Sequence, residues 1–199
     1  RSTLFPYTTL FRSASQMSEE TGLNFSLLAT PAESLCGRFL RIDRKNFGVI
    51  EGVTDKEFYT NSFHIPVNFS IAAGNKIKLE APFHALTNAG HISYIELDGN
   101  LSENAAVTEK IVRCMHDEGI GYGAINHPVD RDPVCGYTGY IGDTCPKCGR
   151  RESEDHIRFE RIRRITGYLT GDLVTWNNAK KAEESMRKPH GMRLPDEVF

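Results

Sequence analysis

Alternating strand and helix patterns between residues 22 and 127 limit the folds open to this chain more than any other feature of its sequence. Short apolar or alternating segments predict strands, and apolar residues that recur about every 3.6 positions predict helices. The expected strands are 24–29, 90–97 and 120–126, and the expected helices are 30–48, 76–88 and 102–118. This order favours an α/β architecture with largely parallel strands.

The first of these helices has a start signal in the segment Thr30-Pro-Ala-Glu33. Thr30 suits the N-cap position, and Glu33 is placed to close a capping box. We expect this helix to end near Gly48, and an earlier helix, of which residues 14–21 are the last part, to end at Gly22.

Residues 1–13 differ from the rest of the chain. They show neither a helical nor a strand period, and they contain too few apolar residues for the core of a signal peptide. The stretch Leu4–Ser13 looks like the in-frame translation of a common sequencing-adapter oligonucleotide. We therefore expect residues 1–13 to be a non-native, adapter-derived segment, and the remainder to be the C-terminal piece of a longer protein.

The charge balance and the apolar pattern argue against two broad classes of protein. The 24 Lys and Arg and the 26 Asp and Glu residues give a net charge of −2, whereas non-specific nucleic-acid binding usually needs a strong basic excess. No apolar run approaches the roughly 18 residues of a membrane-spanning helix. We therefore expect neither a direct nucleic-acid partner nor membrane attachment.

Five cysteines divide into two isolated residues, Cys36 and Cys114, and three clustered ones, Cys135, Cys145 and Cys148. This pattern is typical of reduced thiols with a metal site, not of a disulfide framework, and it favours a cytoplasmic protein. Cys145 and Cys148 are separated by two residues, a spacing at which both thiolates can bind one tetrahedral zinc ion.

The fourth ligand of such a zinc site stays open. A complete second cysteine pair would place a cysteine at position 132, but this chain has Asp132 there. Asp132 offers an oxygen, and His127 or His156 offers a nitrogen; the alternative is that the cysteines are free thiols or that the site is degenerate. No nearby general base faces an open metal position, so we expect a structural zinc rather than a catalytic one.

The composition changes to Pro, Asp, Gly and Cys after His127, and this change divides the chain. The expected parts are an α/β part at 14–127, a zinc knuckle at 128–157, a glycine-containing loop with a final helix at 158–190, and a tail at 191–199.

Within the third of these parts, a basic run leads into a glycine in the segment Arg163-Arg-Ile-Thr-Gly-Tyr168. Together with the cysteines just upstream, it resembles the glycyl-radical motif Arg-x-x-Gly-Tyr of the anaerobic ribonucleotide reductases. The resemblance extends over nearly all of residues 14–190. It also includes the segments Thr30–Ser34, Tyr59–Val67, Asn88–Tyr94 and Trp176–Lys180.

The resemblance implies a fold and a radical site. The fold is the C-terminal part of a ten-stranded α/β barrel of the glycyl-radical enzyme type, followed by the zinc knuckle, a radical loop and a helix. In this family an iron–sulfur, S-adenosylmethionine-dependent activase removes a hydrogen atom from the glycine that corresponds to Gly167. Glycine suits this role because the adjacent amide groups stabilise a radical on its Cα, and no Cβ twists the centre out of plane.

The resemblance also implies a reaction. The radical passes to a cysteine, whose thiyl takes the 3′ hydrogen of a ribonucleoside triphosphate, and the reductant is formate or a thioredoxin-type system. Neither Cys36 nor Cys114 matches that cysteine, so this piece should not catalyse the reduction alone. The full-length enzyme is expected to be a homodimer that supplies deoxyribonucleoside triphosphates for DNA synthesis.

Four polar residues are candidates for the substrate side of the site: Glu33, Asn61, Ser62 and His64. Glu33 follows a predicted strand, where barrel enzymes place their sites, although a capping box explains it equally well. The other three are candidates for lining a nucleotide pocket; the alternative is that they are satisfied polar groups in a packed loop.

Two other functions fit parts of the sequence. A zinc-ribbon binding module, with Gly167 as a simple turn, conflicts with the net charge of −2 and with the α/β part. A glycyl-radical enzyme that acts on another class of substrate conflicts with the cysteine pattern and with the segment Thr30–Ser34.

Overall fold

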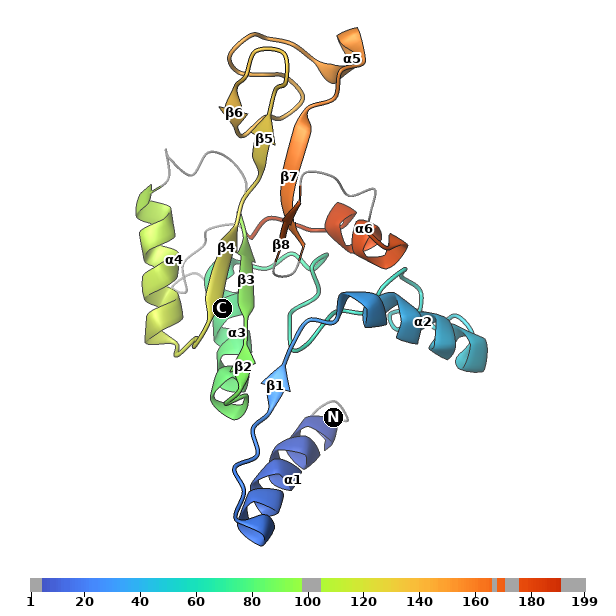
Figure 1. Cartoon of the computed structure of the whole chain (residues 1–199), viewed down its shortest axis with the longest axis vertical. Coiled ribbons are helices and arrows are strands. Elements are labelled where there is room, and N and C mark those ends of the chain that lie inside the picture. The colour runs from blue at the N-terminus through green and yellow to red at the C-terminus, as the bar shows by residue number, and fades with distance from the viewer. Residues whose placement is uncertain (1–4, 98–104, 166–167, 171–175, 191–199) are drawn as a thin grey trace.

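A computed structural model describes residues 5–97, 105–165, 168–170 and 176–190 of the chain. Helix α1 lies at one end of the molecule, the cysteine-containing segment lies at the other, and the strands run between them (Figure 1). The helices are α1 (Phe5–Thr21), α2 (Glu33–Phe47), α3 (Ala73–Leu86), α4 (Ala105–Asp117), α5 (Glu152–Asp155) and α6 (Asn178–Ser185). The strands are β1 (Leu28–Ala29), β2 (Gly90–His91), β3 (Ser93–Glu96), β4 (Gly123–Asn126), β5 (Val129–Arg131), β6 (Thr138–Gly139), β7 (Glu160–Ile165) and β8 (Tyr168–Thr170).

The first half of the chain contains two pairs of parallel strands, as the alternating pattern predicts. Strand β1 pairs with β2, and β3 pairs with β4 from Ser93↔Gly123 to Glu96↔Asn126. The prediction of a single strand at 90–97 is wrong in one respect. The segment divides into β2 and β3, which belong to different pairs. Helices lie between the paired strands in the chain, as parallel connections require.

The main apolar core lies between β3 and helices α3 and α4. Its fully buried centre contains Ile77 and Ile95, and α4 adds Ile111 and Met115, which are four positions apart and therefore share one face. Helix α3 begins at Ala73, earlier than the expected residue 76.

The predicted capping box at the start of α2 is wrong. The N-cap is Ala32, whose backbone is extended at φ −119° and ψ 90°, and no side chain caps the helix. Glu33 is therefore the first helical residue, and the Thr30 hydroxyl donates instead to the carbonyl of Pro31 at 3.4 Å. The predicted end of this helix is confirmed at Gly48, whose φ of 78° suits glycine.

Residues 5–13 are helical, although their sequence shows no helical period. They form the beginning of α1, which ends at Thr21, directly before Gly22, as expected. The adapter-derived origin of residues 1–13 stays a prediction, because a helix forms from native and non-native residues alike.

The glycine-containing segment predicted as a loop is largely a hairpin of strands. Strands β6, β5, β7 and β8 form one antiparallel sheet, and β7 pairs with β8 from Arg163↔Thr170 to Ile165↔Tyr168. Two residues, Thr166 and Gly167, lie between the paired positions in the sequence and fall outside the described residues. The proposed tail at 191–199 also falls outside them.

Helix α6 packs against α2, far away in the sequence. A Cβ atom on Gly37 would lie 2.6 Å from the Cβ of Ala179, so only glycine permits this approach. Cys36, Phe58 and Ala179 form a small buried cluster at the contact. Helix α6 is shorter than the expected final helix, and Asn177 caps it by accepting a hydrogen bond from the Lys180 N–H at 3.0 Å. No helix among the described residues is long and apolar enough to cross a membrane.

Candidate functional site

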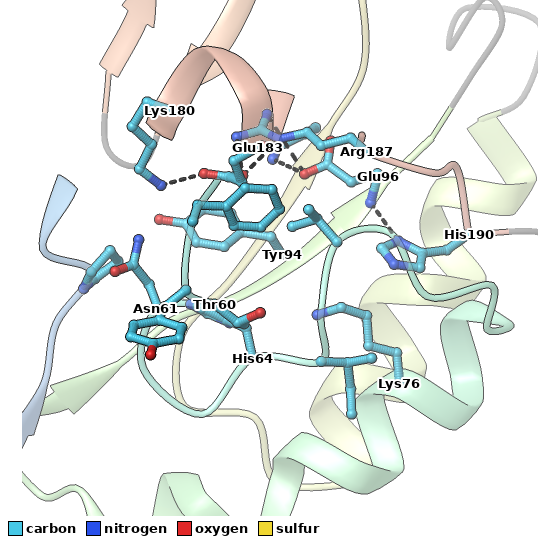
Figure 2. A pocket seen from close by; sticks show the side chains of 16 residues that line it. Thr60, Asn61, His64, Lys76, Tyr94, Glu96, Lys180, Glu183, Arg187 and His190 are labelled. Atoms are coloured by element: carbon cyan, nitrogen blue, oxygen red, sulfur yellow. Dashed lines mark hydrogen bonds and ion pairs between the residues drawn. The ribbon is translucent and has the colours of Figure 1, made fainter. Parts of the chain in front are cut away.

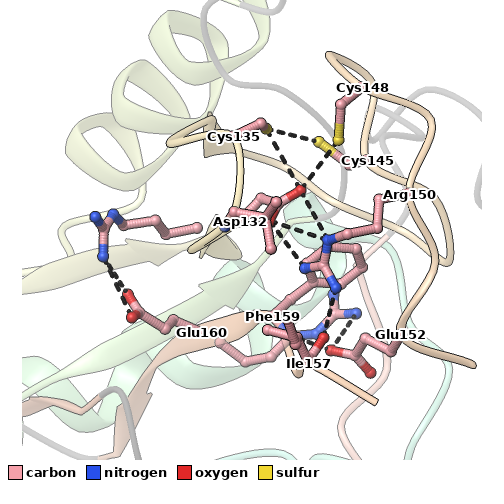
Figure 3. A network of polar contacts seen from close by, with 12 residues as sticks. Asp132, Cys135, Cys145, Cys148, Arg150, Glu152, Ile157, Phe159 and Glu160 are labelled. Atoms are coloured by element: carbon pink, nitrogen blue, oxygen red, sulfur yellow. Dashed lines mark hydrogen bonds and ion pairs between the residues drawn. The ribbon is translucent and has the colours of Figure 1, made fainter. Parts of the chain in front are cut away.

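Four side chains that offer metal-ligand atoms gather in the segment that follows β5, and Figure 3 shows them from close by. We call Asp132, Cys135, Cys145 and Cys148 the cysteine cluster; their ligand atoms all lie within 4.8 Å of one another. The Cys135 and Cys145 sulfurs are 3.6 Å apart, and Asp132 Oδ2 lies 3.4 Å from the Cys135 sulfur and 3.3 Å from the Cys148 sulfur.

These separations suit a tetrahedral metal ion. Zinc binds thiolate sulfur at about 2.3 Å and carboxylate oxygen at about 2.0–2.2 Å, so neighbouring ligands of a tetrahedron lie roughly 3.5–3.8 Å apart. The residues present therefore fit a zinc ion. Neither His127 nor His156 belongs to the group of candidate ligands in the described part of the chain, which favours Asp132 among the three alternatives.

Hydrogen bonds to Oδ1 hold the carboxylate of Asp132 in place. Oδ1 accepts hydrogen bonds from Arg150 Nη2 and from the Val134 N–H, both at 2.9 Å, while Oδ2 faces the sulfurs. Hydrogen bonds from Arg150 hold the pKa of Asp132 far below its usual range, although burial opposes this effect. The guanidinium of Arg150 also lies 4.3 Å from the ring centre of Phe159.

The neighbouring groups of the cysteine cluster also change the pKa of the Cys148 thiol. The backbone N–H of Arg150 favours the thiolate, but desolvation and the Asp132 carboxylate outweigh it and raise the pKa of Cys148 to about 12. A divalent cation reverses this balance, because a metal-bound thiol is deprotonated. Gly149, with φ 75°, forms the tight turn behind the pair, and its N–H donates to the Cys145 carbonyl at 2.9 Å.

The predicted substrate residues divide among different cavities. Glu33 lines an open cavity together with His91, Tyr94 and Arg164. Asn61 and His64 line a second, more enclosed cavity, and Ser62 lines a third one beside Asn61. The structure therefore brings Asn61 close to each of the other two loop residues but does not place all four candidates in one cavity.

Two of these residues have structural contacts. Asn61 Oδ1 accepts a hydrogen bond from the Ala32 N–H at 3.4 Å, and Ser62 Oγ donates to the Ala29 carbonyl at 3.2 Å. His64 differs, because both of its buried ring nitrogens lack a hydrogen-bond partner among the described residues. Its Nδ1 lies 3.9 Å from Glu80 Oε1, too far for a hydrogen bond.

The enclosed cavity is lined by charged residues that sequence reasoning missed. Figure 2 shows Lys180, Glu183 and Arg187 along one wall and Lys76 on the opposite side. Lys76 donates to Glu80 at 2.6 Å, and although burial opposes ionisation, His64 and Lys76 lower the pKa of Glu80 to about 2. A spacing of four between Lys76 and Glu80 was the available signal, but such pairs are common on exposed helix faces.

A buried histidine beside the open cavity leads to a prediction about pH. Burial, and then the neighbouring His64 and His84, lower the pKa of His91 to about 4, while an unfolded histidine titrates near 6.5. The unfolded chain therefore binds more protons between these values. The contribution of His91 to the free energy of unfolding should be fully present above about pH 6.5. It should be lost as the pH falls toward about 4, by up to about 1.4 kcal/mol per pH unit.

Urea unfolding at pH 7.5 and pH 5 measures this effect. His91→Gln should reduce the pH dependence without removing it, because burial also lowers the pKa of His190 to about 4. His116, whose side chain is 87% exposed, provides the control, and His116→Gln should leave the dependence unchanged. An equal dependence in His91→Gln and in the native chain would contradict the prediction.

Comparisons with known proteins agree on one family. The family model described as "Anaerobic ribonucleoside-triphosphate reductase" matches residues 8–190. The anaerobic ribonucleoside-triphosphate reductase of Escherichia coli (strain K12) is 41% identical over 184 residues, which cover 90% of this chain and 25% of that protein. The enzyme of the same name from Enterobacteria phage T4 is 38% identical over 181 residues, which cover 87% of this chain and 29% of that protein.

Solved structures show the same fold. A structure named "Anaerobic ribonucleotide reductase" matches with a TM-score of 0.68 at 23% identity, over 94% of this chain and 28% of that chain. The anaerobic ribonucleotide reductase from Thermotoga maritima, with dATP bound in the specificity site, matches with a TM-score of 0.58 at 24% identity, over 82% of this chain and 25% of that chain. The chain thus spans about a quarter of the length of the relatives that it matches.

Proposed function

Because the chain belongs to the family of anaerobic ribonucleoside-triphosphate reductases, we propose that it is the C-terminal portion of an enzyme that reduces ribonucleoside triphosphates to deoxyribonucleoside triphosphates for DNA synthesis. The family match over residues 8–190 carries this proposal. It includes the segment Arg164–Tyr168 and the cysteine cluster, so the proposed radical residue and the proposed metal ligands both fall within it.

Gly167 is the proposed site of the radical. It lies between Ile165 and Tyr168, which pair across β7 and β8. The guanidinium of Arg164 lies 5.3 Å from the ring centre of Tyr94 on β3, and the Arg164 carbonyl accepts a hydrogen bond from Arg187 at 2.7 Å. The contact with Tyr94 ties β7 to the α/β part of the chain, and the contact with Arg187 ties it to the residues after α6; both support a role of this strand beside the reaction site.

The proposed chemistry moves one hydrogen atom at a time. A separate activase that uses S-adenosylmethionine and an iron–sulfur cluster removes a hydrogen atom from the Cα of Gly167. The glycyl radical then takes the hydrogen atom of a cysteine thiol elsewhere in the full-length enzyme, which leaves a thiyl radical. The thiyl removes the 3′ hydrogen of the ribonucleotide, and the 2′ hydroxyl then takes up a proton and leaves as water. Formate or a thioredoxin-type protein supplies the reducing electrons.

The parallel strands β1 to β4 are proposed to be part of a ten-stranded α/β barrel that encloses the substrate. Glu33 faces the same cavity as Arg164, which supports a place for its carboxylate beside the reacting nucleotide. Asn61, Ser62 and His64 are proposed to line the nucleotide pocket. Of these three, His64 has the best support, because its buried ring nitrogens have no hydrogen-bond partner among the described residues and the nearest charged group, Glu80 Oε1, is 3.9 Å from Nδ1.

The cysteine cluster is proposed to bind a structural zinc ion, with Cys135, Cys145, Cys148 and Asp132 as ligands. Bound zinc supplies a cross-link here and takes no part in the reaction. In this role it joins the start of the sheet, at Asp132 and Cys135, to the segment that precedes β7. We further propose that the full-length enzyme is a cytoplasmic homodimer.

An experiment on the full-length enzyme tests the proposed function. After anaerobic activation, electron paramagnetic resonance should show a doublet, because the unpaired electron on a glycine Cα couples to the one hydrogen that remains there. Exposure of the activated enzyme to air should then cleave the backbone at Gly167, which mass spectrometry of the denatured products detects. An intact chain, despite a confirmed radical, would place the radical at another residue.

A further inference from the structure

The side chain of Asp130 lies on β5 and is fully buried. Both of its oxygens are occupied by donors from other parts of the chain. Oδ1 accepts a hydrogen bond from Arg163 Nη1 at 2.7 Å. Oδ2 accepts from the Ile141 N–H at 3.0 Å and from Arg161 Nη1 at 3.3 Å. A single carboxylate therefore joins β5, β7 and the segment between the cysteines.

The strand register makes one of these contacts unusual. Asp130 lies directly opposite Arg161 in the pairing of β5 with β7. A contact between these two residues is the ordinary cross-strand arrangement. The second contact reaches Arg163, two positions further along β7 in the direction of Gly167. A carboxylate that holds both arginines restrains β7 along its own axis as well as sideways.

The segment between the cysteines braces the same contact. Arg161 also donates to the carbonyls of Ile141 and Gly142. Ile141 is 1% exposed and packs with Cys145 and Phe159 in a small core. Arg161 and Arg163 each have a second, longer ion pair, with Glu152 at 3.8 Å and with Glu184 at 3.7 Å, so without the Asp130 charge both arginines keep a partner but lose their shared, buried one. The position of β7 relative to the metal-binding segment therefore depends on the charge of Asp130.

We propose that Asp130 is a positioning residue that fixes β7 along its axis and thereby fixes where the strand delivers Gly167 to its reaction partner. This inference rests on the proposed function, because it assumes that Gly167 exchanges a hydrogen atom with a cysteine thiol. Such a transfer requires the two groups in close contact, and a displacement of about 1 Å costs on the order of 100-fold in rate.

The test uses the full-length enzyme with Asp130→Asn, which keeps the shape of the side chain but removes its charge. Activated enzyme should retain its metal and its radical, measured as spins per chain. Turnover per radical should fall by about tenfold or more, because the glycyl radical forms but is misplaced relative to the thiol. Amide hydrogen exchange along β7 should become faster, while exchange in β3 and β4 should not change. A lower turnover per radical, with metal and radical content unchanged, distinguishes a positioning role of Asp130 from a general loss of structure.

Two further variants complete the experiment. Arg163→Gln removes the axial contact but keeps the contact between Asp130 and Arg161, and it should lower turnover per radical in the same way. The control is Glu160→Gln, because Glu160 forms an exposed ion pair with Arg131 on the same sheet and should leave the ratio unchanged.

The outcomes distinguish this inference from the proposed function. A native doublet with an unchanged turnover per radical in Asp130→Asn and Arg163→Gln would overturn the inference alone. Loss of metal in both variants would also overturn it, because the carboxylate would then act by holding the cysteine cluster. A native enzyme that forms no doublet would overturn the proposed function, and this inference with it.

Discussion

Gly167→Ala is expected to abolish both the radical doublet and the ribonucleotide reduction of the activated full-length enzyme. The radical is stable only while the Cα is planar with its two amide groups, and a Cβ forces it out of that plane. Alanine also adds a methyl group at a position that the activase and the thiol must both reach. The measurements are electron paramagnetic resonance after anaerobic activation and product formation per chain, and both should fall to background.

A matched glycine provides the control for this substitution. A Cβ on Gly142 would meet no atom within 4 Å, and its backbone is not in the left-handed region. Gly142→Ala should therefore keep the doublet and the turnover. The same doublet in Gly167→Ala would show that another residue stores the radical, and it would exclude Gly167 from the mechanism.

Cys145→Ser is expected to remove the metal, with the zinc content falling from about one ion per chain to nearly none. Cys145 is 1% exposed, and its sulfur lies 3.6 Å from that of Cys135. A hydroxyl is a poor ligand for zinc, and the buried position prevents another group from replacing it. Metal analysis of the purified protein gives the zinc content directly.

Two other variants provide a control for this result and a test of the fourth ligand. Cys114 lies on α4, away from the cysteine cluster, so Cys114→Ser should keep the full zinc content. Asp132→Ala should weaken zinc binding if the carboxylate is the fourth ligand. Unchanged zinc in Cys145→Ser would remove the cysteine cluster as the metal site, and unchanged zinc affinity in Asp132→Ala would remove only the carboxylate.

The parts of the fold that local patterns determine could be predicted. The helical spacing of Ile111 and Met115 needs no knowledge of distant partners, and α4 formed within the expected range; an extended segment at 90–97 was also predictable, although not its division into β2 and β3. The grouping of the cysteines was also predictable. A spacing of two residues restricts where a pair of thiolates can lie, and position 132 follows from the same spacing.

The strand β7 could not be predicted from its own residues, since its arginines make it resemble a solvated basic loop. Arg161 and Arg163 are accommodated by Asp130, which precedes them by about thirty residues, and no local pattern reveals that carboxylate. The predicted capping box at the start of α2 failed for a different reason. The extended backbone of Ala32 separates Thr30 from the helix, and the Ala32 N–H donates instead to Oδ1 of Asn61, a distant residue, at 3.4 Å.

The enclosed cavity shows the limit of reasoning from residue types. Lys76 and Glu80 are almost fully buried on α3, while Leu79 on the same helix is 55% exposed. Hydrophobic periodicity assigns these positions the other way round. The charges are tolerated because they pair with one another, and pairs of this kind become visible only when the elements are assembled.

The packing of α6 determines what oxygen damage would look like. Ala179 fits against Gly37, and His190 exchanges hydrogen bonds of 2.8 Å with the backbone of Glu96, so the C-terminal residues are attached by contacts that do not depend on the backbone beyond β7. A chain nicked at Gly167 would keep its severed end bound. Native gels and gel filtration would then count damaged molecules as whole ones, and only a denaturing separation would reveal how much of a preparation had been lost to air.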